Sequence, residues 1–269
     1  MKKGTPKSCV FIGGKQFGVD CLRILLASDK KPKLVVPNPD DGGVDTWHES
    51  LAKASRENGL STAKETNLNS ESLIERISKI KPDIIFCIGG TQILPKKLLH
   101  IPPKGCVNIH PALLPKYRGR YSIPHAIFNG DKQIGATVHF MDEGMDKGPI
   151  IAQKKITLSQ DDTAKTAYEK FTSVASKMFS ELVDDWVKGK TISATPQDES
   201  EATYYPLGLP NAGVLDWSWD GERVRNFIRA MTFEPFPPAC FYLGQKRMVI
   251  VDDSYVNMLE YISVKKAVE

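Results

Sequence analysis

Two polar side chains end an apolar segment near the middle of the chain. Residues 106–115 have the sequence Cys-Val-Asn-Ile-His-Pro-Ala-Leu-Leu-Pro, which places Asn108 and His110 two residues apart. Side chains two apart on an extended strand point to the same face, and Pro111 cannot continue the hydrogen-bond ladder. We expect an amide and an imidazole side by side at the end of a strand, unless both only satisfy backbone groups of the next loop.

A second polar group follows the apolar segment 136–141. Residues 142–148 have the sequence Asp-Glu-Gly-Met-Asp-Lys-Gly, whose two glycines favour a tight loop that holds a carboxylate against a neighbouring strand end. A carboxylate beside an imidazole favours the imidazolium, and an amide donor beside both could hold an oxygen that becomes negative during attack. The pattern predicts acyl transfer without a covalent protein intermediate. His139 also lies here, but its apolar strand favours a structural role.

Short apolar segments alternate with helical patterns over the first two thirds of the chain. This alternation predicts an α/β fold with a mainly parallel, Rossmann-like sheet, in which ligands bind at the carboxyl ends of the strands. The expected strands are residues 8–13, 33–36, 83–88, 105–109, 136–141 and 150–156. The expected helices are residues 17–28, 47–58, 73–80 and 163–187, the last with an aromatic stripe that we assign to the core.

The amino-acid composition changes after about residue 189, where a polar stretch is followed by one rich in Pro and Gly. We expect a catalytic domain over residues 1–200 and a small α+β domain over residues 201–269, with a helix at 220–231 and strands at 240–243 and 247–251. The aromatic residues Phe233, Phe236, Phe241 and Tyr242 suggest a homodimer through this part, although burial within one chain would explain them equally well.

Composition and cysteine usage are those of an ordinary globular protein. The net charge of +4 is spread along 269 residues, which is weak evidence for nucleic-acid binding. No stretch has the length of a membrane span, and the N-terminus lacks the features of a signal peptide. The five cysteines form no C-x-x-C pair, so we expect buried thiols, no metal site and a cytoplasmic protein.

The two polar segments together resemble the signature of formyltransferases that use 10-formyltetrahydrofolate. The resemblance rests on Asn-Ile-His-Pro-Ala-Leu-Leu-Pro at 108–115, Arg-Gly at 118–119 and the glycine loop at 142–148, and it covers roughly residues 8 to 188. It implies the formyltransferase fold and identifies Asn108, His110 and Asp146 as the catalytic residues. Asn108 and protonated His110 would stabilise the oxyanion, while Asp146 would orient His110 and assist proton movement.

The resemblance also implies where the folate co-substrate binds. Gly-Thr-Gln-Ile-Leu-Pro at 90–95 is similar to the family's folate-binding loop, whose backbone groups bind the pterin. This assigns cofactor binding to Gln92, Ile93, Leu94, Met141 and Asp142. No metal is implied.

The family formylates several kinds of amine, and three acceptors compete. A glycinamide ribonucleotide enzyme would be about 200 residues long, so the last 70 residues disfavour it. A methionyl-tRNA enzyme needs a C-terminal part that attracts phosphates, yet residues 201–269 contain seven basic and nine acidic residues, a net charge of 7 − 9 = −2. A folate-binding protein with an inactive site is a further alternative, which the intact catalytic residues disfavour. An NAD-dependent oxidoreductase is excluded because residues 13–18 are not G-x-G-x-x-G.

Sugar-nucleotide N-formyltransferases fit more of the chain. Segments 119–125, 209–217 and 227–239 resemble those enzymes, whose usual acceptor is a dTDP-linked 3- or 4-amino-dideoxy sugar made for surface polysaccharide such as lipopolysaccharide O-antigen. The expected partner is a nucleotide-linked amino sugar, with no nucleic acid and no membrane. We expect substrate contacts at Lys15, Trp47, Arg118, Arg120 and Tyr121, although each could be a solvated or packing residue.

Overall fold

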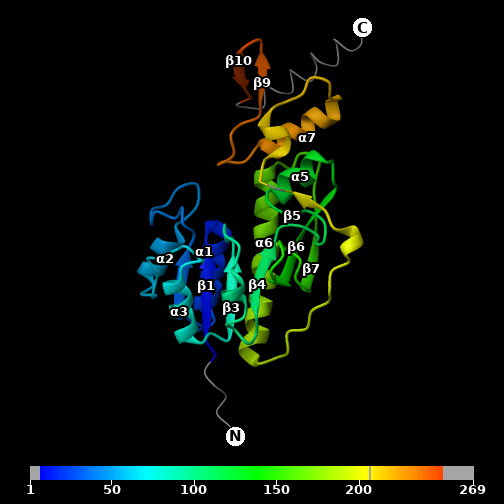
Figure 1. Cartoon of the computed structure of the whole chain (residues 1–269). Helices are drawn as coiled ribbons and strands as arrows, with labels where there is room; N and C mark the ends of the chain where they lie inside the picture. The colour runs from blue at the N-terminus through cyan, green and yellow to red at the C-terminus, as the bar shows by residue number, and fades with distance from the viewer. Residues whose placement is uncertain (1–6, 206, 251–269) are drawn as a thin grey trace. The chain divides into compact units, whose positions relative to one another are not determined.

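A six-stranded, mainly parallel sheet organises the protein, as Figure 1 shows for the computed structural model, which describes residues 7–205 and 207–250. Its strand order is β2-β1-β3-β4-β6-β7. The strands are β1 (Cys9–Gly13), β2 (Leu34–Pro37), β3 (Ile84–Ile88), β4 (Cys106–His110), β6 (Gln133–Phe140) and β7 (Ile150–Thr157). β1 pairs in parallel with β2 and β3, β3 pairs in parallel with β4, and β4 pairs antiparallel with β6. The predicted α/β fold is confirmed.

The chain forms two compact units. Of the described residues, the first contains 7–110, 136–154 and 172–200, and the second contains 111–135, 155–171, 201–205 and 207–250. One boundary coincides with the predicted division after residue 200, but the second unit also includes two earlier segments. The assignment of catalysis to residues 1–200 stays a prediction.

Helices cover the sheet of the first unit. They are α1 (Lys15–Ala27), α2 (Leu51–Glu57), α3 (Glu71–Ile80), α4 (Lys96–Leu99) and the later part of α6 (Ala164–Lys188). Alternating strand residues such as Val10 and Ile85 pack with Leu73 and Ile77 of α3. Phe86 of β3, which follows Ile85, instead contacts α6.

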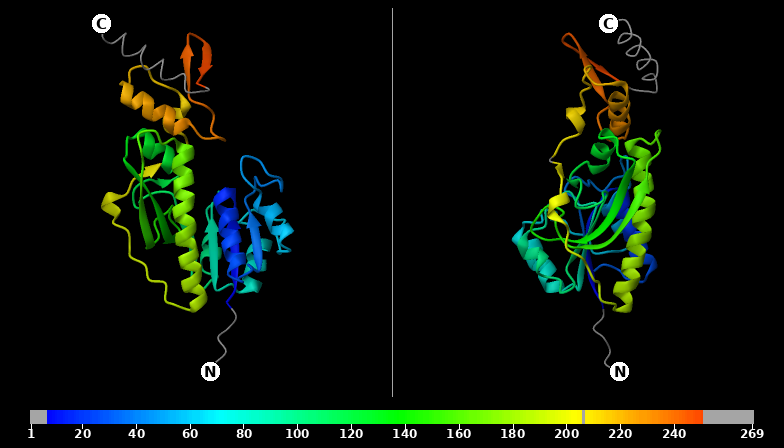
Figure 2. Two further views of the ribbon diagram at one scale, coloured as in Figure 1. Left: turned by 180° about the vertical axis from the view of Figure 1, so that it is seen from behind. Right: turned by 90° about the vertical axis from the view of Figure 1, so that its right-hand side faces the viewer.

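The aromatic stripe of α6 packs into the core, as predicted. Phe179 and Trp186 meet Phe86 edge to face, with ring centroids 5.2 and 5.7 Å apart. All three side chains are buried. Figure 2, in its right-hand view, shows this part of the helix running along one face of the sheet.

The second unit is built around two packed helices, α5 (Ser122–Phe128) and α7 (Gly221–Met231). Its apolar cluster joins Phe128 to Val224, Phe227 and Ile228. An antiparallel hairpin of β9 (Cys240–Leu243) and β10 (Lys246–Val249) follows, and β5 (Arg118–Gly119) pairs in parallel with β8 (Tyr204–Tyr205). Asp220 caps α7 by accepting a hydrogen bond from the Arg223 backbone N–H at 2.8 Å.

The structure shortens one predicted helix and contains two helices that the sequence did not predict. The helix expected over residues 47–58 begins only at Leu51, because Ser50 is its N-cap. The carboxylates of Asp45 and Asp41 accept hydrogen bonds from backbone N–H groups at this helix start. α4 and α5 were not expected at all. α4 is a single turn, and α5 contains Pro124 within a pattern too short to show helical periodicity.

The predictions for the cysteines and for the C-terminal aromatic residues have different outcomes. All five cysteines are buried free thiols, as expected. Within the second unit Phe233 and Phe236 contact each other, and Phe241 contacts Trp217, whereas Tyr242 is exposed. The homodimer therefore stays a prediction. Residue 251, the last of the expected strand 247–251, lies outside the described residues.

Candidate active site

The three predicted catalytic residues lie together in the first unit. Asn108 and His110 stand at the carboxyl end of β4, where Pro111 ends the strand. Asp146 lies in the loop after β6, and its Oδ2 atom is 3.6 Å from His110 Nδ1. The side chain of His110 is 6% exposed and that of Asp146 is 14% exposed, so the pair is largely shielded yet still open to solvent on the carboxylate side.

His139 completes this cluster from the neighbouring strand. It is the direct cross-strand partner of Asn108, and its Nε2 atom lies 3.4 Å from Asn108 Nδ2 and 3.7 Å from Asp146 Oδ1. Its Nδ1 atom is 2.8 Å from the Phe140 carbonyl, which can only accept, so Nδ1 carries a proton. In the neutral ring Nε2 is then an acceptor for the Asn108 amide.

Burial keeps His139 neutral. Desolvation lowers the pKa of His139 and outweighs the Asp146 carboxylate, which raises it. The amide of Asn108 is oriented from its other end as well, because Asn108 Oδ1 accepts from the Ile109 backbone N–H at 2.8 Å. His139 therefore positions Asn108.

The loop that carries Asp146 is held by backbone contacts. Asp146 has a φ of 52°, in the left-handed region that few side chains adopt. The Nε2 amide of Gln197 donates to the carbonyls of Asp146 and Gly148 at 2.8 and 2.7 Å. A Cβ atom on Gly148 would lie 1.8 Å from the Phe140 carbonyl oxygen, so only glycine fits where the loop returns past the end of β6.

The predicted folate-binding residues lie on two loops of the same unit. Gln92 uses its side chain to bind the 66–68 segment, donating to the Thr66 carbonyl at 2.8 Å and accepting from the Leu68 N–H at 3.3 Å. Ile93 is 66% exposed, whereas Leu94 is in the core. These positions fit a role for the loop's backbone rather than for the Gln92 side chain.

The other folate-binding loop begins directly after β6. Met141 donates its backbone N–H to the Cys106 carbonyl at 2.8 Å, and its side chain packs against the core cluster. Asp142 turns the loop by accepting from the Gly144 N–H at 2.9 Å. Its carboxylate is therefore used in shaping the loop.

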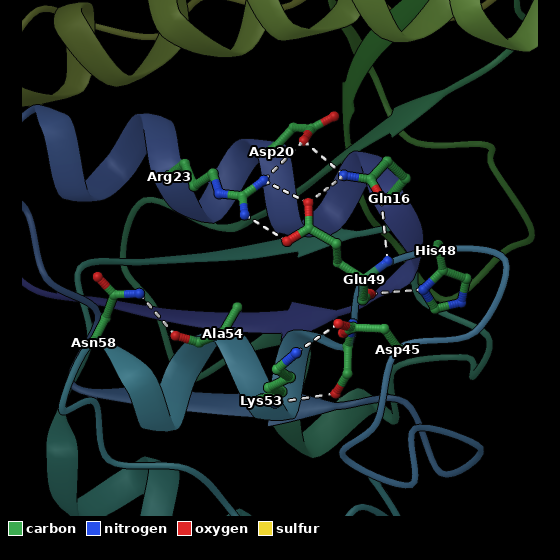
Figure 3. A network of polar contacts seen from close by, with 10 residues as sticks. Gln16, Asp20, Arg23, Asp45, His48, Glu49, Lys53, Ala54 and Asn58 are labelled. Atoms are coloured by element: carbon green, nitrogen blue, oxygen red, sulfur yellow. Dashed lines mark hydrogen bonds and ion pairs between the residues drawn. The ribbon is translucent and has the colours of Figure 1, made fainter.

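Lys15 and Trp47 belong to segments that follow β1 and β2. Lys15 is half-buried at the start of α1 with a φ of 60°, and the half-buried Trp47 meets His48 edge to face at 4.5 Å. Figure 3 shows how the segment at His48 and Glu49, directly after Trp47 in the sequence, is tied to α1. Glu49 accepts from Arg23 at 2.8 and 2.5 Å and from Gln16 at 3.2 Å. The loop is therefore anchored directly after Trp47 and His48.

The other three predicted substrate contacts belong to the second unit. Arg118 is fully buried, contacts the Tyr204 hydroxyl and lies 5.2 Å from the centre of that ring. Such burial does not fit direct contact with a substrate and indicates a structural role. Arg120 is exposed, and Tyr121 packs against Phe236 with ring centroids 5.5 Å apart. Substrate contact stays a prediction for these two.

Over residues 7–205 and 207–250, no group of three or more His, Cys, Asp and Glu side chains is placed to hold a metal ion. Within the same part of the chain, no helix is long and apolar enough to cross a membrane.

Comparison with known proteins identifies the family. The model of the formyl transferase family matches residues 9–183, which include Asn108, His110, His139 and Asp146. The chain belongs to the formyl transferase family. The protein is therefore an N-formyltransferase.

Individual relatives of this formyl transferase name different acceptors. A methionyl-tRNA formyltransferase of Desulfotalea psychrophila is 35% identical over 242 residues, covering 89% of this chain and 74% of its own. Among solved structures, WlaRD, a sugar 3N-formyl transferase crystallised in the presence of dTDP and 5-N-formyl-THF, has a TM-score of 0.73 at 22% identity, covering 87% of this chain and 83% of its own. Methionyl-tRNA formyltransferase from Clostridium thermocellum has a TM-score of 0.65 at 18% identity, covering 91% and 92%. These structures establish the shared fold.

Sequence reasoning missed two residues of the formyl transferase site. The sequence favoured a packed or hydrogen-bonded structural role for His139, but it did not indicate the antiparallel pairing with Asn108 that places His139 in the cluster. Gln197 lies in the polar segment that follows α6, where nothing in the local sequence points to a partner 51 residues away. Strand pairing could have suggested the first, whereas the second depends on the folded chain.

Proposed function

We propose that this N-formyltransferase moves a formyl group from 10-formyltetrahydrofolate to the amine of a nucleotide-linked amino sugar. The observation that carries the catalytic part is the contact of Asp146 with His110 beside the Asn108 amide. The acceptor part rests on the charge of the C-terminal residues and on the segments that resemble sugar-nucleotide enzymes.

In the proposed reaction the amine nitrogen forms a bond to the formyl carbon, the bond from that carbon to N10 of the folate breaks, and a proton passes from the amine to N10. The Asn108 amide and the protonated His110 ring donate to the oxygen that becomes negative. Asp146 stabilises the charged ring and holds its Nδ1 side, leaving Nε2 of His110 for the reacting oxygen. Proton movement from amine to N10 is assisted by Asp146, directly or through water.

The residues around this cluster fit a folate donor. The backbone of Gln92, Ile93 and Leu94 and the loop at Met141 and Asp142 would hold the pterin. The exposed Ile93 supplies apolar surface beside it, and the Gln92 side chain keeps the loop in place through its bonds to the 66–68 segment. The bound donor supplies the activated formyl group.

A nucleotide-linked sugar suits the charge of the chain better than a tRNA. Residues 201–269 carry a net charge of 7 − 9 = −2, which repels a phosphate backbone. Lys15 would meet the diphosphate, and Trp47 would line the acceptor pocket in a loop that Glu49 anchors to α1. Arg120 and Tyr121 are proposed as further contacts, while the buried Arg118 would act by holding Tyr204. WlaRD, which shares this fold, is a sugar 3N-formyl transferase, and this is compatible with such an acceptor.

Formylation of methionyl-tRNA is the second candidate. It is favoured by the relatives at 35% identity that carry this name. Both candidates use the same catalytic residues and donor, so they differ only in the acceptor.

The test is turnover of 10-formyltetrahydrofolate with a panel of dTDP- and UDP-linked 3-amino and 4-amino sugars, with methionyl-tRNA and glycinamide ribonucleotide as comparison substrates. We expect one amino sugar to be formylated with a kcat/KM at least about 100-fold above the comparison substrates. Turnover of methionyl-tRNA alone would overturn the sugar acceptor and leave the catalytic roles intact. The Asn108→Asp variant should lose about 10²- to 10³-fold in kcat with whichever acceptor works.

A further inference from the structure

The second unit contains a polar cavity of about 400 Å³ that the formyl-transfer site does not use. One face of α7, from Gly221 to Arg229, forms one wall, and the segments 131–132 and 158–160 form the others. Every lining residue belongs to the second unit, whereas Asn108, His110 and Asp146 belong to the first. The volume is within the range of small-molecule sites.

Positive side chains outnumber negative ones around this cavity. Lys132, Arg225 and Arg229 line it together with Asp131 and Glu222, a net charge of 3 − 2 = +1. Asp131 already accepts a hydrogen bond from the Tyr117 hydroxyl at 2.7 Å.

Two of the three basic side chains that line the cavity are not held by an ion pair in the described part of the chain. Lys132 and Arg225 are exposed, and within the described part of the chain their side chains make no hydrogen bond or ion pair. Gly221 and Glu222 place the first turn of α7, the positive end of its dipole, on the same cavity. These groups favour an anion.

The guanidinium of Arg229 is held in place before any ligand arrives. It donates to the Asp162 carbonyl at 2.7 Å and to Asn226 Oδ1 at 2.6 Å. A positioned guanidinium loses little side-chain entropy when it binds an anion, and its planar donors suit phosphate oxygens.

Asn226 supplies a second, independent indication of a ligand. Its side chain lines the cavity and only 8% of the residue is exposed. Because Oδ1 faces the Arg229 donor, the orientation of the amide is determined and Nδ2 is the remaining group. In the described residues Nδ2 has no hydrogen-bond partner. The Nδ2 atom keeps some access to solvent, so a ligand oxygen in the cavity can accept a hydrogen bond from it.

We propose that this cavity binds a phosphorylated small molecule, with Asn226, Arg225 and Arg229 as its phosphate ligands and Lys132 at its rim. A single phosphate would fill only part of about 400 Å³, so the remaining space would hold the organic part of the ligand. This site shares no residue with the acceptor site proposed above, and it does not depend on which amine is formylated.

Inorganic pyrophosphate is the probe, and isothermal titration calorimetry on the full chain measures its binding. Because the proposed acceptor site also meets a diphosphate, all titrations use the Lys15→Ala protein as background. In this background we expect Arg225→Ala and Asn226→Asp each to weaken pyrophosphate binding at least about 10-fold. Arg247→Ala is the matched control, since Arg247 is an exposed arginine of the same unit that does not line the cavity.

The pyrophosphate affinities of the variants, compared with one another, test the proposal. Equal affinities for the Arg225→Ala and Arg247→Ala proteins would overturn the proposal, because the binding would then be general surface attraction. A Kd above about 10 mM in the Lys15→Ala background would also overturn it. Arg225 is exposed, so its substitution leaves the core intact, and a thermal melt shows whether Asn226→Asp remains folded. A formyl-transfer assay on Arg225→Ala distinguishes this site from the catalytic one, because turnover without the probe should be unchanged.

Discussion

Asp146 Oδ2 lies 3.6 Å from His110 Nδ1, so the carboxylate faces the Nδ1 side of the imidazole. The same carboxylate is 3.7 Å from His139 Nε2 through its other oxygen. Asp146 therefore links the two strands that carry the site.

Asp146→Asn tests the charge of this carboxylate. The amide is nearly the same size but cannot stabilise a protonated His110, so we expect kcat for formyl transfer to fall about 10³-fold. Glu143→Gln makes the same chemical change in the same loop, where the exposed Glu143 pairs with Lys96 at 2.7 Å. Its kcat should match that of the native protein. Equal activity of the two variants would show that Asp146 has no part in the reaction.

Asn108→Asp tests the amide donor while preserving the local backbone. The carboxylate can still accept from the Ile109 N–H, which Asn108 Oδ1 meets at 2.8 Å, but it removes the donor and adds negative charge beside the developing oxyanion. We expect kcat to fall about 10²- to 10³-fold, with the melting temperature little changed. Steady-state kinetics and a thermal melt measure both. A variant with native kcat would remove Asn108 from the proposed mechanism.

The sequence predicted most of the sheet because its signals are local. Apolar runs at 8–13 and 83–88 lie within a residue of β1 and β3, and the spacing of Asn108 and His110 correctly placed both at the end of β4. The 163–187 pattern likewise matched α6 to within one residue. Periodicity and Pro111 were sufficient for these elements.

The features that the sequence did not predict depend on contacts between distant segments. Gln197 binds a loop 51 residues away, and Asn38, buried at the end of β2, donates to the Gly89 carbonyl at 3.0 Å and accepts from the Thr91 N–H at 3.1 Å. The burial of Arg118 depends on the pairing of β5 with β8. Such tertiary pairings leave no periodic trace, so composition and spacing cannot reveal them.

His139 makes folding stability depend on pH. Desolvation lowers the pKa of His139 below its usual value of 6.5, so the unfolded chain binds a proton that the folded chain resists. The stability associated with neutral His139 is present above pH 6.5 and is lost as the pH falls through the lower folded-state pKa. We expect His139→Gln to lose less unfolding free energy than the native protein between pH 7.5 and 5.0, measured by urea denaturation. Parallel curves for the two proteins would contradict this assignment.

Gln197→Leu tests whether the backbone of the Asp146 loop needs its anchor. The substitution removes both bonds from Nε2, to the Asp146 and Gly148 carbonyls at 2.8 and 2.7 Å, and leaves the catalytic side chains in place. We expect kcat to fall about 10-fold, with the KM for the folate donor nearly unchanged, since small displacements of a catalytic group are costly. Ser193→Ala, an exposed change in the same segment, is the control. A change in KM alone would assign Gln197 to substrate binding instead.

Gly148→Ala tests the close approach of the loop to the end of β6. The added Cβ atom would lie 1.8 Å from the Phe140 carbonyl oxygen and 2.7 Å from its carbon, so the backbone must move and carry Asp146 with it. We expect a loss of about 2 kcal/mol in unfolding free energy together with a fall in kcat. Gly42→Ala is the matched control, because a Cβ at Gly42 meets nothing within 4 Å. If Gly148→Ala retained native stability and native kcat, the loop would have to reach the His110 site by another backbone path.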